Sequence, residues 1–232
     1  MSDLIGNELP NETLVFMDKD KGPQPLKILD FCKGKKIVIF GVPGAFTPTC
    51  ARNHLPGFIE NADKIREKAV DEIVCFATND IFTMSAWEEM SGSNGKIKFL
   101  SDSKAEFAKS LGTDYPDTFG TSIKTKRCSL LVNDGIIEKF FVEVDGGKVD
   151  VSGANKMMDL LYFILLSERP PVYQQFHFRN HLNDLSPTPI LSSVYRSDCL
   201  IQPKDLYFLR LFFVRSSNYW FSTFLSTPEY LA

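Results

Sequence analysis

The chain has 232 residues, a length that suits one large domain or one domain with an appendage. Its net charge of −3 and the absence of a long basic run argue against nucleic acid as a partner. No secretory signal is visible at the N-terminus and no apolar stretch is long enough to cross a bilayer, so we expect a soluble, cytoplasmic protein without membrane contact.

The cysteines bear on the redox compartment and on metal binding. There are five of them, at Cys32, Cys50, Cys75, Cys128 and Cys199. Their odd number, irregular spacing and lack of a Cys-x-x-Cys pair argue against a disulfide scaffold and against a zinc site. We therefore expect free thiols in a reducing compartment, with no metal and no cofactor.

The first part of the chain is predicted to form short elements before a buried strand. Residues 13–16 and 25–28 have the composition of strands, on either side of a turn-rich segment at 18–23. A helical turn is expected at 29–32. The wholly apolar run at 37–40 then indicates a strand buried on both faces.

The segment Gly41–Phe58, GVPGAFTPTCARNHLPGF, is predicted to be a loop followed by a helix start. Thr47 suits the N-cap, and Pro48 suits the first helical position, where its missing N–H costs nothing. Cys50 then lies in the first helical turn. Unpaired backbone N–H groups and the positive end of the helix dipole favour a thiolate there.

Pro56 is expected to kink or restart this helix, because it lacks a hydrogen-bond donor and clashes with the preceding turn. Beyond it, apolar residues recur at helical spacing and are predicted to face the core. These residues are Phe58, Ala62, Ile65 and Ala69.

The middle of the chain alternates between predicted strands and helices. The expected elements are a fully apolar strand at 73–77, a helix at 81–90, a short strand at 97–100 and a helix at 105–111 ended by Gly112. In the helix at 81–90 we expect Phe82, Ala86 and Trp87 to be buried.

The late part of the domain is predicted to close the sheet. Residues 113–126 resemble a loop, and strands at 127–133 and 136–143 are expected to form a hairpin around Asp134-Gly135. A last helix is expected at 152–161. Together these elements predict an α/β sandwich with a mixed central sheet flanked by helices.

From residue 162 the composition changes. Residues 162–232 contain no glycine, a single lysine and more than half of the aromatic residues of the chain. We therefore divide the chain into a domain at 1–161 and an irregular, poorly ordered tail at 162–232. A native extension and a non-native tail from a mistaken gene model both remain open.

The motif around Cys50 carries a family resemblance. Pro43-Gly44-Ala45-Phe46-Thr47-Pro48-Thr49-Cys50, followed by HLPGF, resembles the type II peroxiredoxins, also called the peroxiredoxin-5 group. The similarity runs over residues 1–161 and includes Ser101-Asp102 and Lys126-Arg127. It implies a thioredoxin-like fold and a thiol peroxidase that reduces hydrogen peroxide and alkyl hydroperoxides.

The resemblance also implies the roles of four residues. The Cys50 thiolate would attack the peroxide O–O bond to form a sulfenic acid, Thr47 would hold the peroxide, Pro43 would exclude water, and Arg127 would polarise both thiolate and peroxide. From the residues alone, a buried core thiol, a plain N-cap, a turn residue and an exposed strand-end arginine are the alternatives.

His54 lies four residues after Cys50, so a Cys–His dyad, as in a hydrolase, is conceivable. Pro56 perturbs the helix at this point, and the resemblance gives the role of a base to no histidine. We therefore expect His54 to support the site from the rim of its pocket.

Cys75 bears on how the enzyme would be recycled. Plant-like type II members are thought to use a cysteine at this strand position to resolve the sulfenic acid as an intramolecular disulfide. Vertebrate-like members use a later one, near the place of Val151 here. Two schemes therefore remain open, resolution by Cys75 and reduction by an external thiol.

The resemblance implies thioredoxin or glutaredoxin with glutathione as reductants, and pairing as a homodimer through the face near the active-site loops. A second functional hypothesis is a non-catalytic redox sensor or chaperone-like oligomer whose pocket the tail covers.

Overall fold

The structure is a computed structural model that describes residues 4–118, 120–167, 213–216 and 219–222. The chain divides into two compact units, Met1–Phe176 and His177–Ala232. In the second unit, β10 (Phe213–Ser216) and β11 (Tyr219–Ser222) pair as an antiparallel two-stranded sheet. Apart from these strands and the end of the last helix, the predicted irregular tail lies outside the described residues.

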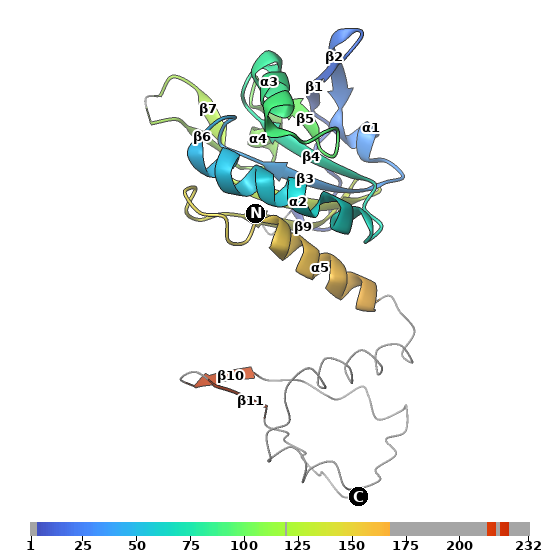
Figure 1. Cartoon of the computed structure of the whole chain (residues 1–232), viewed down its shortest axis with the longest axis vertical. Coiled ribbons are helices and arrows are strands. Elements are labelled where there is room, and N and C mark those ends of the chain that lie inside the picture. Colours follow the sequence, from blue (N-terminus) through green and yellow to red (C-terminus); the bar gives the residue numbers. More distant parts are fainter. Residues whose placement is uncertain (1–3, 119, 168–212, 217–218, 223–232) are drawn as a thin grey trace, which may run out of the picture. The chain divides into compact units, whose positions relative to one another are not determined.

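A seven-stranded sheet, in the order β2-β1-β5-β4-β3-β8-β9, forms the centre of the first unit (Figure 1). Its strands are β1 (Thr13–Asp18), β2 (Gly22–Lys27), β3 (Lys36–Gly41), β4 (Glu72–Ala77), β5 (Lys98–Ser101), β8 (Cys128–Asn133) and β9 (Ile136–Val142). β3, β4 and β5 are parallel to one another, and the other pairings are antiparallel. The predicted mixed sheet is confirmed.

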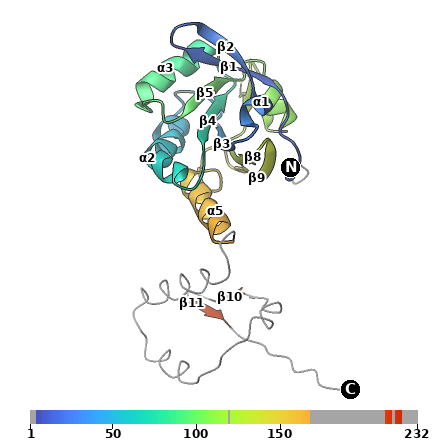
Figure 2. The ribbon, with the colours of Figure 1, turned by 90° about the vertical axis from the view of Figure 1, so that its right-hand side faces the viewer.

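Helices cover both faces of this sheet. They are α1 (Ile28–Cys32), α2 (Leu55–Arg66), α3 (Ile81–Ser91), α4 (Glu106–Ser110) and α5 (Ala154–Ser167). Figure 2 shows α2 and α1 on opposite sides of β3 and β4. Side chains alternate along β3, so that Val38 and Phe40 pack with α2, α3 and α5, whereas Ile37 and Ile39 pack with α1 and α4. The fold is the predicted thioredoxin-like α/β sandwich. No helix in the described ranges is long and apolar enough to span a membrane.

The predicted inward face of α3 is partly wrong. The helix buries Ile81, Met84 and Trp87, which recur every third residue from its first turn. Phe82 is 67% exposed and Ala86 is exposed as well. The apolar character of Phe82 pointed to the core, but its position on the helix directs it to solvent.

The face predicted for the helix after Cys50 is confirmed for Phe58, Ala62 and Ile65, which are buried. It is wrong for Ala69, because α2 ends at Arg66. Ala69 then adopts a φ of 60° in the following turn and is exposed. Helical spacing does not apply beyond the end of the helix.

Two predictions for the late part of the domain need correction. Residues 113–126 are not only loop, because β6 (Asp114–Pro116) and β7 (Ile123–Thr125) pair as a small antiparallel sheet. The hydroxyl groups of Thr113 and Thr125 lie 2.9 Å apart in its buried base. The last helix runs to Ser167, so the predicted domain boundary after residue 161 falls within α5.

Candidate active site

The thiol of Cys50 lies in an unusual first turn of a helix. Helical conformation begins at Pro48, and Cys50–His54 forms a single π-helical turn that passes into α2 at Leu55. Pro56 was expected to kink or restart the helix, but the helix passes it without a break and only changes from π to α at Leu55. The Cys50 side chain is fully buried. Single π-helical turns occur frequently at functional sites, and this one places a thiol at the positive end of a helix.

Thr47 precedes this helix, as predicted for an N-cap, and its carbonyl oxygen accepts from Ala51 N–H over 2.9 Å. The predicted side-chain cap is wrong, however, because the Thr47 hydroxyl donates to the Gly44 oxygen over 2.9 Å. A turn at Phe46, with a φ of 60°, is part of this loop. The Asn79 side chain, absent from the sequence-based site, accepts from the loop at Ala45 N–H over 2.9 Å.

Arg127 reaches the thiol from a distant part of the chain. The antiparallel pairing of β3 and β8 places Gly41 opposite Cys128, so the start of β8 lies beside the loop that leads to Cys50. Arg127 Nη2 donates to Cys50 Sγ over 3.4 Å. The side chain is only 2% exposed, which rules out the alternative of an exposed strand-end arginine. A permanent positive charge thus lies beside the sulfur.

The other donors of Arg127 bind neutral acceptors. Nε and Nη2 donate to the Gly146 oxygen over 3.3 and 3.1 Å, and Nη1 binds His54 Nδ1 over 3.1 Å. The guanidinium is therefore fixed on three sides, by the sulfur, by a loop carbonyl and by an imidazole.

His54 supports the site from the core rather than from the predicted pocket rim, since it is 1% exposed. Burial lowers the pKa of His54 to about 4, and the Arg127 charge adds to this effect, while the bond to Ser152 opposes it. Its ring is thus neutral at neutral pH. Since a guanidinium only donates, Nδ1 accepts from Arg127, and Nε2–H donates to the Ser152 oxygen over 3.0 Å. Both nitrogens are occupied, which argues against a dyad with Cys50.

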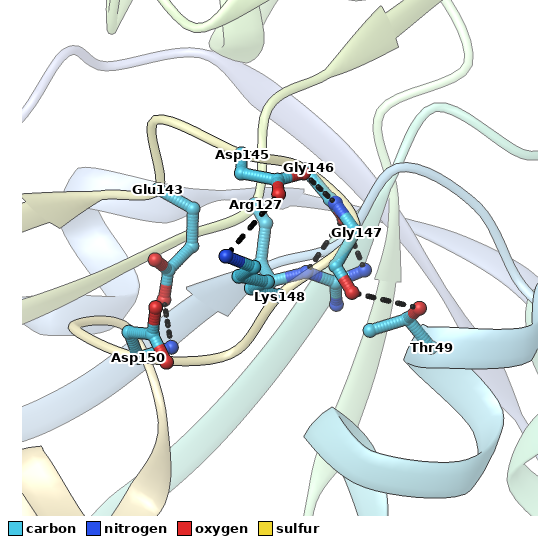
Figure 3. A network of polar contacts seen from close by, with 8 residues as sticks. All are labelled: Thr49, Arg127, Glu143, Asp145, Gly146, Gly147, Lys148 and Asp150. Atoms are coloured by element: carbon cyan, nitrogen blue, oxygen red, sulfur yellow. Dashed lines mark hydrogen bonds and ion pairs between the residues drawn. The ribbon is translucent and has the colours of Figure 1, made fainter.

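A buried carboxylate, Glu143, was missed by the sequence-based analysis. It follows β9, and its Oε1 accepts the backbone N–H groups of Asp150, Val151 and Ser152, each over 2.8 Å. Figure 3 shows this carboxylate beside Asp150, within the same group of residues as Arg127. The glycines of this loop predict a turn, but nothing in the pattern distinguishes Glu143 from a solvated strand-end glutamate.

Cys75 lies in the same apolar cluster as Cys50, on the central strand β4. Burial raises the pKa of the Cys75 thiol well above its usual value, and the nearby cysteines add to this effect. Burial likewise raises the pKa of Cys32 and of Cys128 to about 12. These three thiols are therefore protonated in the folded protein. All four described cysteines are free, and Cys199 lies outside the described residues.

A pocket of about 530 Å³ opens beside the guanidinium. Its lining residues are Pro43, Tyr115, Lys126, Arg127, Val142, Glu143, Val144 and Gly146. The predicted residues Pro43 and Arg127 thus share one cavity. In the described part of the chain, no group of three or more His, Cys, Asp or Glu side chains is placed to hold a metal ion.

Known proteins resemble this chain in sequence and in structure. The Redoxin family matches residues 4–158. Peroxiredoxin-2B of Arabidopsis thaliana is 39% identical over 159 residues, which cover 68% of this chain and 97% of that protein. Reduced Prx3 of Vibrio vulnificus, solved in complex with hydrogen peroxide, is 36% identical with a TM-score of 0.65, over 68% of this chain and 98% of that one.

Peroxiredoxin 5 from Alvinella pompejana is 29% identical with a TM-score of 0.58, over 68% of this chain and 97% of that one. These matches confirm the family expected from the motif around Cys50. The chain therefore belongs to the peroxiredoxin family and is a thiol-dependent peroxidase.

Proposed function

We propose that Cys50 is the peroxidatic cysteine and that Arg127 activates it. The observation that carries this proposal is the 3.4 Å contact between Arg127 Nη2 and Cys50 Sγ. The sulfur bonds to one peroxide oxygen as the O–O bond breaks, and the leaving oxygen takes a proton to become water or an alcohol. Sulfur is oxidised to sulfenic acid while the peroxide is reduced, so the electrons balance.

Thr47 and Pro43 are proposed to complete the site. The Thr47 hydroxyl, which now donates to Gly44, would exchange this bond for a peroxide oxygen. Pro43 lines the pocket beside Arg127 and offers no N–H to water, so it would shield the sulfenic acid. Donors fixed before the reaction stabilise the charge that develops on the leaving oxygen.

The proposed substrates are hydrogen peroxide and alkyl hydroperoxides. The Vibrio vulnificus relative was solved with hydrogen peroxide, which supports the first. Val142, Val144 and Tyr115 line the pocket next to Arg127, and their apolar surfaces suit the organic group of an alkyl hydroperoxide.

Two recycling routes are compatible with the site, and both use thioredoxin or glutaredoxin with glutathione as the final reductant. In one, Cys75 resolves the sulfenic acid after the turn at Cys50 opens, as the resemblance to plant-like members suggests. In the other, the external thiol attacks Cys50 itself once the same turn opens, and no second cysteine takes part. The complete burial of Cys75 on a central strand favours the second route.

We also propose that the protein forms a homodimer in the cytoplasm. An apolar hollow of about 350 Å³ lies near the active-site loop, lined in part by Phe46, Trp87 and Met90. Phe46 and Met90 are 46% and 77% exposed, and the contact of these apolar side chains with water costs free energy in an isolated chain.

The cytoplasmic location is supported by the cysteines. All four described cysteines are free thiols, which suits a reducing compartment.

Peroxide consumption by the purified full-length protein tests the role of Cys50. With thioredoxin or glutaredoxin present, the wild type should consume hydrogen peroxide, and Cys50→Ser should not. Cys32→Ala, which alters an equally buried thiol in the core cluster that does not contain Cys50, is the matched control and should remain active. Equal activity of Cys50→Ser and the wild type would refute the proposal.

A further inference from the structure

Glu143 and Arg127 are neighbours that do not pair. Glu143 N–H donates to the Arg127 oxygen over 2.9 Å, which places the two residues opposite each other at the ends of β9 and β8. Opposite residues of adjacent strands project on the same face of a sheet. A buried carboxylate next to a guanidinium normally forms an ion pair. Yet none of the ion pairs in the described ranges joins Glu143 to Arg127.

The Glu143 carboxylate is instead held by the loop that follows it. Its Oε1 accepts the backbone N–H groups of Asp150, Val151 and Ser152 and also the Ser152 hydroxyl, each over 2.8 Å. Consecutive backbone N–H groups that converge on one oxygen form a typical anion-binding nest. Hydrogen bonds to a charged acceptor are roughly twice as strong as neutral ones. Glu143 is 7% exposed, so water competes little for these bonds.

Three carbonyl groups of this loop accept hydrogen bonds from residues at the active site. The Gly146 oxygen accepts from Arg127, the Ser152 oxygen accepts from His54, and the Gly147 oxygen accepts from the Thr49 hydroxyl over 3.2 Å. Figure 3 shows Gly146 beside Arg127 and Gly147 beside Thr49. One loop therefore contacts the guanidinium, its imidazole support and the residue before Cys50.

We propose that Glu143 is a positioning residue for the peroxidase reaction. Its carboxylate fixes the loop at residues 144–152, whose carbonyl groups orient Arg127 towards Cys50. The same hydrogen bonds keep the carboxylate from neutralising the guanidinium, so that the positive charge remains available to the sulfur and the peroxide. The inference rests on the proposed roles of Cys50 and Arg127 and adds a residue that acts through Arg127 rather than on the sulfur.

Single-turnover oxidation of the reduced full-length protein by hydrogen peroxide tests this role, because it excludes the recycling steps. Glu143→Ala should lower the second-order rate constant on the order of tenfold, since a misplaced guanidinium no longer meets the reacting atoms. Glu143→Gln keeps an acceptor oxygen without the charge and should fall between this variant and the wild type. Glu138→Ala is the matched control, because Glu138 lies on β9, five residues before Glu143, and accepts a hydrogen bond from the Asn133 side chain rather than from the loop.

A second measurement separates positioning from mere stabilisation. Cys50 can also be alkylated by iodoacetamide, and in this reaction Arg127 has no peroxide oxygen to hold. If Glu143 positions Arg127, Glu143→Ala lowers the ratio of the peroxide rate constant to the iodoacetamide rate constant. A variant with a lower melting temperature but an unchanged ratio, or a peroxide rate constant within twofold of the wild type, would overturn the inference.

Amide hydrogen exchange of the wild type keeps the inference testable even if Glu143→Ala does not fold. The N–H groups of Asp150, Val151 and Ser152 should exchange far more slowly than the N–H of Gly146, and exchange at equal rates would overturn it. The proposed function is tested separately by Cys50→Ser. An inactive Cys50→Ser with a fully active Glu143→Ala would leave the peroxidatic role standing and refute only the inference.

Discussion

The Arg127 guanidinium donates to the Cys50 sulfur over 3.4 Å, although 77 positions separate the two residues in the chain. The antiparallel ladder between β3 and β8 brings them together, because Arg127 directly precedes β8 and the loop that leads from β3 to Cys50 begins beside it. The contact therefore depends on the register of the sheet. A shift of one residue would direct Arg127 to the opposite face.

Replacement of Arg127 by lysine should slow the oxidation of Cys50 about a hundredfold, although the charge is kept. An ammonium group cannot bind the sulfur, Gly146 and His54 at once, as the planar guanidinium does. Single-turnover kinetics with hydrogen peroxide measures the effect. Arg52→Lys changes an exposed arginine in the helical turn that contains Cys50, and it serves as the control. A rate for Arg127→Lys equal to that of the control would contradict the proposed role.

His54 should make the stability of the fold depend on pH. Its pKa is about 4 in the folded protein and 6.5 in a model peptide, so below pH 6.5 the unfolded chain binds a proton that the folded chain does not. The free energy of unfolding should therefore fall as the pH drops from 6.5 to about 4, by roughly 1 kcal/mol per pH unit, and this contribution should level off below pH 4. Urea unfolding at several pH values measures this slope.

The difference between the wild type and His54→Gln isolates this effect, because all other titrating groups are common to both proteins. Glutamine keeps an acceptor for Arg127 and a donor for Ser152, but it does not titrate. The variant should lack the His54 contribution to the slope. Parallel pH dependences for the two proteins would show that His54 does not have a depressed pKa.

Replacement by alanine should change the stability of the protein in opposite directions at two glycines. A Cβ at Gly41 would lie 2.7 Å from Cys128 Sγ and from ring atoms of Phe76, so Gly41→Ala should destabilise the protein by about 1 to 3 kcal/mol. A Cβ at Gly57, in helix α2, meets only Ala154 Cβ at 4.0 Å, so Gly57→Ala should stabilise it by about 0.5 to 1 kcal/mol. Chemical denaturation of both variants measures the two changes in stability. Changes of the same sign would contradict the expectation.

A charge at Phe46 should dissociate the proposed dimer. Phe46 packs near Trp87, with ring centroids 6.2 Å apart, and its exposed part borders the apolar hollow. Phe46→Asp should therefore sediment as a monomer at concentrations where the wild type is a dimer. Phe82→Asp, at an exposed position of α3 outside that hollow, should leave the dimer intact. A wild type that sediments as a monomer would refute the proposed pairing.

Cys75→Ala should distinguish the two recycling routes. If an external thiol attacks Cys50 directly, the variant retains turnover with glutaredoxin and glutathione, and no Cys50–Cys75 bond appears after one equivalent of peroxide. If Cys75 resolves the sulfenic acid, intact mass spectrometry of the wild type shows an intramolecular disulfide, and the variant accumulates a more oxidised Cys50. Disulfide formation requires the Cα atoms to come within about 7 Å.

The sequence alone located the strands of the sheet well, since runs such as Ile37–Phe40 are apolar throughout and end at glycine. It was less reliable for the burial of helical side chains, because adjacent positions of a helix point in different directions, as at Phe82. The local pattern also predicted Cys50 at a helix start, whereas the role expected of Arg127 came only from a resemblance, because the contact between the two depends on tertiary structure. Glu143 was missed, since its bonds to backbone N–H groups of a loop leave no trace in residue types.

The full burial of Cys50 in its helical turn has a consequence for the rate of the catalytic cycle. A peroxide is small enough to diffuse to an enclosed sulfur, whereas a protein as large as thioredoxin is not. If such a protein is the reductant, as proposed, reduction has to wait for the residues around Cys50 to unwind, at a frequency set by the fold and independent of how much reductant is present. Added reductant should accelerate turnover only until that unwinding becomes the slowest step.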